Sequence, residues 1–185
     1  MKIVNETNMT KIITITGDLG SGKSTVSNIL IERLHYDYVY TGKIQREIAD
    51  RYGMTTLELN QYAETHPEID EEIDATFKSL NDSAELIVDS RLAWFFIPKS
   101  FKVYLKCDII VAADRISRDK QRKSEHYASQ EKAIQELIAR KESENKRYLE
   151  LYGADCSDLS NFNLIVDTSY LTPEEVADKI IAEYF

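Results

Sequence analysis

The sequence predicts an α/β protein in three layers, with a five-stranded parallel sheet between two layers of helices. Five short runs rich in β-branched and aromatic residues alternate with stretches of helical periodicity, and this alternation is typical of a parallel sheet. A glycine-rich turn follows the first run. No repeat and no Gly/Ser or Pro tract divides the chain, so we expect a single domain over residues 1–185.

The predicted strands follow one another at intervals that leave room for helices. They read KIITIT at 11–16, YDYVY at 36–40, ELIVD at 85–89, FKVYLK at 101–106 and FNLIVD at 162–167. Capping boxes predict two helix starts, at Thr55 with Glu58 and at Thr172 with Glu175. Pro173 occupies the favoured first position of the second of these helices.

Residues 41–82, between the second and third predicted strands, read as helical and polar throughout. A crossover between parallel strands needs only about a dozen residues, so this segment is a long insertion. We expect the insertion to build the site for a phosphate acceptor.

Composition excludes several classes of protein. Lys and Arg number 23 against 32 Asp and Glu, and the net charge of −9 repels nucleic acids over most of the surface. No apolar run approaches the ~20 residues that span a bilayer, and no signal or transit peptide is visible. We therefore expect no membrane partner. Cys107 and Cys156 make neither a disulfide framework nor a thiolate metal site, so we expect a cytoplasmic protein.

A phosphate-binding motif occupies the turn after the first predicted strand. The pattern G-x-x-x-x-G-K-[ST] is matched by Gly17, Asp18, Leu19, Gly20, Ser21, Gly22, Lys23 and Ser24. In such a loop Lys23 contacts the β- and γ-phosphates of ATP, Ser24 binds Mg²⁺, and Thr25 is a further hydroxyl for the α-phosphate. A glycine turn that only caps a helix is the alternative, but the strand before it and the helix after it favour a P-loop fold.

Asp89 ends the third predicted strand. Ligands of open α/β sheets collect at the carboxyl ends of strands, so we expect this carboxylate to face the magnesium ion and to contact it through water. The alternative is that Asp89 caps the next short helix.

Several arginines are candidates for binding and transferring phosphate. Arg46 and Arg91 follow the second and third strands, where the phosphate of an acceptor is expected. Arg115, Arg118 and Arg122 share one helix face and are predicted to close over the transferring phosphoryl group. A solvated basic face is the alternative for this trio.

With these positions assembled, the chain resembles the cytidylate kinases, and within them the short, archaeal-type branch of the nucleoside monophosphate kinases. The resemblance runs from about Ile12 to the C-terminus. It is carried by ITGDLGSGKSTVS, TGKIQREIA, DSRLAWF, DRISRD, RKESENKRY and NLIVDTSYL, in this order.

The resemblance implies roles for further residues. Arg46 and Arg91 are implied to hold the acceptor's monophosphate. The family has an R-x-x-x-D-x-x-R pattern whose members contact the acceptor nucleotide. Its positions correspond here to Arg140, Glu144 and Arg147. Their spacing alone predicts no more than an ion pair within a helix. Glu144 replaces the aspartate of the family, and GKIQRE departs from relatives that often carry a glutamate and an aromatic residue, so base and sugar preference stay open.

The resemblance also implies a lid and a reaction. Arg115 and Arg118 are implied to belong to an arginine-bearing lid near 118–128. Together with Lys23 of the phosphate loop, they are the expected catalytic residues. The expected reaction is phosphoryl transfer from ATP, with Mg²⁺, to a nucleoside monophosphate, CMP or dCMP being favoured. A kinase of another small metabolite on the same fold, or a nucleotide-regulated binding protein without useful turnover, are the alternatives.

Overall fold

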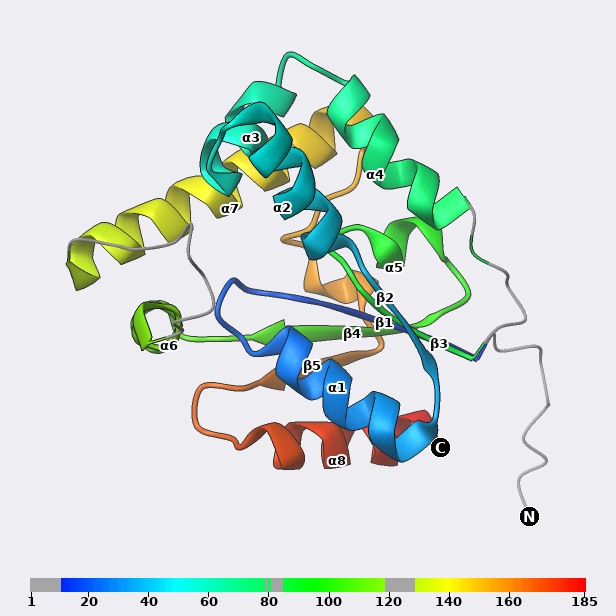
Figure 1. The fold of residues 1–185 in the computed structure, drawn as a ribbon. Helices are drawn as coiled ribbons and strands as arrows, with labels where there is room; N and C mark the ends of the chain where they lie inside the picture. The colour runs from blue at the N-terminus through cyan, green and yellow to red at the C-terminus, as the bar shows by residue number, and fades with distance from the viewer. Residues whose placement is uncertain (1–10, 79, 81–84, 119–128) are drawn as a thin grey trace.

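The computed structural model describes residues 11–78, 80, 85–118 and 129–185, and it confirms the predicted fold (Figure 1). Five strands form one sheet in the order β2-β3-β1-β4-β5, and every pair is parallel. The strands are β1 Ile12–Gly17, β2 Asp37–Tyr40, β3 Leu86–Asp89, β4 Phe101–Lys106 and β5 Leu164–Asp167.

Helices cover both faces of the sheet. Figure 1 shows α1 and α8 together on one face and α2, α3, α4, α5 and α7 on the other. Their bounds are α1 Lys23–Leu34, α2 Thr41–Tyr52, α3 Thr56–Ala63, α4 Glu68–Lys78, α5 Ala93–Phe96, α6 Ile109–Arg118, α7 Gln130–Tyr152 and α8 Pro173–Tyr184, with a 3-10 turn at Leu159–Asn161. Within the described ranges no helix is both long and apolar enough to cross a bilayer.

The central strand β1 is buried along its whole length, because helices lie on both sides of it. Ile13 and Ile15 lie in one apolar cluster with Leu30 of α1 and Ile180 of α8. Ile12 points to the opposite face, into a second cluster beside α4 and α5. Successive side chains of a strand point to opposite faces, so one apolar run supplies both layers of the core.

Both predicted capping boxes are confirmed. The Thr55 and Thr172 side chains accept hydrogen bonds from the backbone N–H groups of Glu58 and Glu175, whose carboxylates accept from the capping residues in return. Pro173 opens α8 as expected. The stretch from 41 to 78 is helical as predicted, divided into α2, α3 and α4.

The sheet topology brings the carboxyl ends of β1 and β3 together. β3 lies directly beside β1, with Asp89 opposite Ile15. The glycine-rich turn that follows β1 therefore begins next to the last residue of β3. This neighbourhood is where the chemistry-bearing residues meet.

Candidate active site

The glycine-rich turn packs tightly against β4 and α6. A Cβ atom added to Gly17 would lie 2.2 Å from the backbone oxygen of Leu105, and one added to Gly20 would lie 2.8 Å from the Cα of Ala112. Gly20 also has a φ of 75°, a conformation in which L side chains are strained. The Asp18 N–H donates to the Leu105 carbonyl at 2.9 Å. Glycine is thus required for the close approach that shapes the loop.

Lys23 begins α1 directly after the loop. Its Nζ donates to the carbonyl oxygens of Gly17 at 3.0 Å and Asp18 at 2.8 Å, so the ammonium group lies over the loop. The N–H groups at the start of α1 and the helix dipole add positive potential at the same place. The hydroxyl of Ser21 is buried and has no hydrogen-bond partner among the described residues. These features suit a bound polyphosphate.

Asp89 and Ser24 form a pair beside the loop. The Ser24 hydroxyl donates to Asp89 Oδ2 at 3.1 Å, and the Tyr38 hydroxyl donates to the same oxygen at 3.4 Å. Asp89 is buried, and burial raises the pKa of its carboxyl although Lys23 and Ser24 oppose the shift. A buried carboxylate that is not fully compensated favours a nearby cation, and Mg²⁺ prefers oxygen ligands. Ser24 and Asp89 therefore fit a magnesium ion.

Asp89 does not cap the helix that follows it. The N-cap residue of α5 is Leu92, and this helix has no side-chain cap. The helix-capping alternative for Asp89 is thus not what the structure shows, and its carboxylate faces Ser24 instead.

A cleft of about 700 Å³ opens between the loop and the helical insertion. Its wall on the loop side includes Lys23, Ser24, Thr25 and Asn28. The opposite wall is formed by residues from the end of β2, α2, the α2–α3 region, the end of β3 and α7, namely Tyr40, Thr41, Gly42, Gln45, Arg46, Ala49, Asp50, Met54, Thr56, Asp89, Ser90, Arg91 and Arg140. Three arginines thus line the same cleft as the phosphate loop.

Arg46 and Arg91 both lie in this wall, as the sequence predicts for residues near strand ends. Arg46 Nη2 donates to the Tyr40 hydroxyl at 2.7 Å, and its guanidinium lies 5.1 Å from the centre of the Tyr40 ring. Arg91 donates to the Gly17 carbonyl and pairs with Glu144. Its Nη2 atom is buried and has no hydrogen-bond partner in the described part of the chain. That nitrogen is well suited to an anionic ligand.

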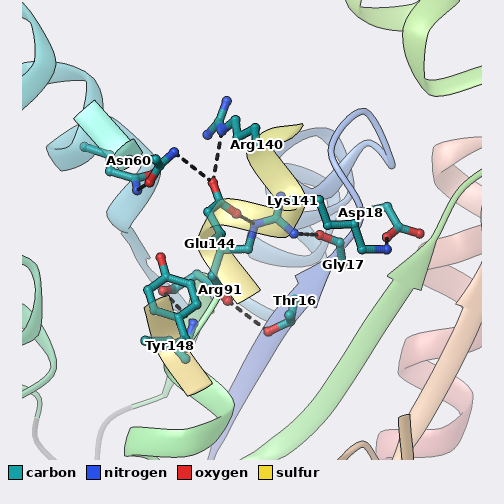
Figure 2. Close-up of polar contacts among 12 residues, drawn as sticks. Thr16, Gly17, Asp18, Asn60, Arg91, Arg140, Lys141, Glu144 and Tyr148 are labelled. Carbon is teal, nitrogen blue, oxygen red and sulfur yellow. Dashed lines mark hydrogen bonds and ion pairs between the residues drawn. The ribbon is translucent and has the colours of Figure 1, made fainter. Parts of the chain in front are cut away.

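Glu144 lies at the centre of a buried polar network (Figure 2). Its carboxylate pairs with Arg91 Nε at 2.9 Å and Arg140 Nε at 3.0 Å, and it accepts from Asn60 Nδ2 at 3.2 Å. Burial favours the neutral acid, but Arg91, Arg140 and Arg147 outweigh it and hold the pKa of Glu144 below its usual value. Glu144 does not line the cleft; it holds two arginines that do.

Arg147 joins α7 to the helical insertion. Its Nε atom pairs with Asp70 Oδ2 at 3.0 Å, and its Nη atoms donate to the backbone and side-chain oxygens of Asn60 at 2.7 and 3.0 Å. Only 2% of the residue is exposed, and it does not line the cleft. The contact with acceptor that the family resemblance implies for Arg147 and Glu144 stays a prediction; in this structure both residues bind protein groups.

The Asp18 carboxylate turns away from the loop interior. It accepts hydrogen bonds from the Tyr104 hydroxyl at 2.8 Å and the Cys107 N–H at 2.9 Å, and it pairs with Lys141 Nζ of α7 at 2.7 Å. Burial works against these contacts, which together lower the pKa of Asp18. This contact of Lys141 could not be predicted from the sequence, because a lysine on a long polar helix carries no local signal of a distant partner.

A second hollow, of about 290 Å³, meets the first at the loop. Both hollows are lined by Gly20, Gly22 and Thr25, and the second is completed by Ser21, Val26, Arg115, Ile116, Thr168, Leu171, Pro173 and Val176. Arg115 Nη2 donates to the Thr168 carbonyl at 2.7 Å. The residues that the segment after β5 contributes were not predicted, although this segment follows the carboxyl end of a strand, which was a usable signal.

Arg118 lies outside both hollows. Its side chain is 78% exposed and pairs with Asp114 one helical turn away. Arg122 and most of the expected lid at 118–128 fall outside the described residues. The structure thus separates Arg115, which touches the loop, from Arg118, whose catalytic role stays a prediction.

Comparison with known proteins decides the family. A model described as "Cytidylate kinase-like family" matches residues 12–170. The chain belongs to the cytidylate kinase-like family. A cytidylate kinase of Sulfurisphaera tokodaii is 39% identical over 176 residues, which cover 94% of either chain. A cytidylate kinase of Sulfolobus acidocaldarius is 40% identical over 172 residues, which cover 91% of either chain.

Members of the cytidylate kinase-like family are phosphotransferases, and this chain is an enzyme of the nucleoside monophosphate kinase type. The fold is shared more widely. A shikimate kinase of Bacteroides thetaiotaomicron has a TM-score of 0.62 at 14% identity and covers 94% of this chain and 95% of its own. At this identity the likeness concerns the fold alone, so the acceptor must be argued from the site.

Proposed function

We propose that the chain transfers the γ-phosphoryl group of ATP to a pyrimidine nucleoside monophosphate, CMP or dCMP in preference, and forms ADP and the nucleoside diphosphate. One observation carries this proposal. The phosphate loop with Lys23 and the arginines Arg46 and Arg91 line the same cleft of about 700 Å³. A polyphosphate on one wall and a monophosphate on the other are then within reach of each other.

The donor is assigned to the loop and the hollow of about 290 Å³ beside it. Lys23 and the N–H groups of the loop are proposed to bind the phosphates, with Thr25 beside them. Ile116, Leu171 and Val176 offer apolar surface for the base of ATP, and the planar guanidinium of Arg115 can stack on it. This assignment gives Arg115 a role on the donor's base rather than on the phosphate in flight.

The acceptor is assigned to the wall formed by the helical insertion, residues 41–82, within the single kinase domain. Arg46 and Arg91 are proposed to hold its monophosphate bidentately. Arg140 lines the same wall and is held by Glu144, so it too is proposed to contact the acceptor. Glu144 and Arg147 are proposed to act on the acceptor through the residues that they hold.

The chemistry requires positioning and charge neutralisation more than proton transfer. The acceptor's own phosphate oxygen attacks in line, so no strong protein base is needed. Lys23 neutralises charge on the donor's phosphates, and Arg91 neutralises charge on the acceptor. Ser24 and Asp89 would hold Mg²⁺, which would reduce the negative charge on the donor's phosphates. Arg118 is proposed to close over the reacting groups and exclude water.

A substrate panel tests this proposal. Purified protein is incubated with MgATP and one acceptor at a time, and ADP and the new diphosphate are measured. The panel contains CMP, dCMP, UMP, AMP, and shikimate as a non-nucleotide alcohol. We expect the highest kcat/KM with CMP or dCMP. Turnover of the alcohol alone would show that the chain is a kinase of another metabolite, and ATP binding without turnover of any acceptor would favour a nucleotide-regulated binding protein.

A further inference from the structure

A narrow hollow continues the cleft beyond the arginines, toward α4. It shares Thr41, Gln45, Ser90 and Arg91 with the wall of the large cleft. Its volume is about 20 Å³, room for about one water molecule, so it must widen to admit a nucleobase. Because it starts at Arg91, it lies where the base of an acceptor would extend once its phosphate is bound there.

The inner walls of this hollow suit a flat aromatic ring. They are formed by Ile73, Phe77, Leu92 and Tyr148. Sites for small ligands typically combine such apolar and aromatic walls with a few polar groups that fix orientation. The polar groups of the inner part are therefore the ones that can select a base.

Those polar groups are two carboxylates of α4. Asp70 and Asp74 are one helical turn apart, line the hollow together and are only 3% and 7% exposed. Asp70 pairs with Arg147, and Asp74 Oδ2 accepts from the Tyr152 hydroxyl at 2.5 Å.

Placing two like charges side by side in a buried site is unfavourable unless donors meet them. Burial and the neighbouring Asp74 raise the pKa of Asp70, although Arg147 opposes the shift. Ionised carboxylates accept hydrogen bonds and cannot donate them, so the polar part of this hollow is a surface of acceptors. A ligand that brings an N–H donor would improve the balance, and a ligand that brings a carbonyl oxygen would worsen it.

Pyrimidine bases differ in this respect at one ring position. Cytosine carries an amino group, a donor, where uracil carries a carbonyl oxygen, an acceptor. We propose that Asp74, supported by Asp70, selects cytosine over uracil by accepting a hydrogen bond from the exocyclic amino group of the acceptor's base. This inference rests on the proposed function, because it places the base from the acceptor phosphate at Arg91.

Asp74→Asn tests the inference with little change of shape. The amide oxygen can still accept from Tyr152, while the amide nitrogen presents a donor that suits uracil. A hydrogen bond to a charged group is worth roughly a tenfold to hundredfold change in kcat/KM. We expect the ratio of kcat/KM for CMP to that for UMP to fall by at least about tenfold, with the KM for ATP unchanged. Glu71→Gln, on the exposed side of the same helix, is the matched control and should leave the ratio as it is.

A second measurement needs no variant. The monophosphate of 2-pyrimidinone riboside differs from CMP only by lacking the amino group. The wild-type enzyme should use it with a kcat/KM at least about tenfold below that for CMP, and Asp74→Asn should shrink this difference. Equal use of both compounds by the wild type, or an unchanged CMP to UMP ratio in a folded Asp74→Asn, would overturn the role of the carboxylate and leave the kinase standing. No turnover of any monophosphate would remove the proposed function, and this inference with it.

Discussion

Lys23 contacts the phosphate loop and is not part of the buried core. It is partly exposed, and it donates hydrogen bonds to the carbonyl oxygens of Gly17 and Asp18. We expect Lys23→Ala to lower kcat by at least about 10²-fold, because an electrostatic contact to the transferring phosphates is lost, while the melting temperature stays within a few degrees. Steady-state kinetics and thermal unfolding measure the two effects. Lys99→Ala, at an exposed site away from both hollows, should change neither.

Arg46 belongs to the other wall of the cleft. Because it lies opposite the loop, Arg46→Ala should raise the KM for the monophosphate at least about tenfold and leave the KM for ATP nearly unchanged. Arg51→Ala is the matched control, since Arg51 is exposed on the same helix and pairs only with Glu72 among its described contacts. Equal damage to both KM values would contradict the assignment of the two walls.

Glu144 is predicted to stabilise the protein in a pH-dependent way. Removing its charge in Glu144→Gln leaves Arg91 and Arg140 without their carboxylate, a change that typically costs about 3–5 kcal/mol at a buried pair. The pKa of Glu144 is lowered by folding, so its contribution is present above the ordinary value of 4.5 and is lost as pH falls through the folded value. The stability difference between wild type and Glu144→Gln should therefore shrink below about pH 4.5.

Denaturant unfolding at a series of pH values checks this expectation. Glu142→Gln, an exposed neighbour on α7, should unfold like the wild type at every pH. A difference for Glu144→Gln that grows toward acid would contradict the direction of the pKa shift. At neutral pH the same variant should also raise the KM for the acceptor, because Arg91 and Arg140 lose the group that orients them.

At the scale of elements, the phosphate loop depends on its contact with α6. Gly20 and Gly22 both have positive φ, 75° and 84°, but only Gly20 lies against another element, the backbone of Ala112. Gly22→Ala should cost about 1–2 kcal/mol through its backbone conformation alone. Gly20→Ala should cost more, because the new methyl group also meets α6 at less than 3 Å. Melting temperatures of the two variants give the order, and a Gly20 variant as stable as the Gly22 variant would argue against the close contact.

The helix α7 shows which contacts can be predicted from local sequence and which cannot. The spacing of Arg140 and Glu144 predicted an ion pair within the helix, and that pair forms. The other partners of Glu144, Arg91 and Asn60, come from distant parts of the chain and leave no trace in the spacing. The same holds for Asp70 and Asp74, which belong to an acidic helix whose charges would ordinarily face solvent. In the folded chain, Asp70 and Asp74 are instead buried against Arg147 and Tyr152 of α7.

At the scale of the whole molecule, strand pattern and loop motif were enough to predict the sheet and to place the glycine-rich turn and Asp89 at the same edge of it. These features depend on residues within one element or at the end of one strand. There the hydrophobic periodicity and the residues that end an element predict the local structure. The acceptor wall could be predicted only in outline. It is assembled from α2, the end of β3 and α7, so its geometry depends on tertiary contacts such as those of Glu144 with Arg91 and Arg140.

The assembled molecule makes a prediction about a ligand that spans it. Because the loop and the arginines line one cleft, adenosine and cytidine joined through five phosphates should occupy both walls at once. Linking two binding groups raises affinity by roughly 10²–10⁴-fold when the linker fits the span. We expect the pentaphosphate to bind at least about 10²-fold more tightly than either ATP or CMP, as measured by calorimetry in the presence of magnesium.

Arg46→Ala provides the internal control for this ligand. If the second nucleotide is held where we propose, the variant should lose most of the gain from linking while its affinity for ATP stays close to that of the wild type. A pentaphosphate that binds wild type no better than ATP does would mean that the two walls do not serve two substrates together. In that case no second anion would lie between Lys23 and the arginines Arg46 and Arg91. Those arginines would then have to bind the donor.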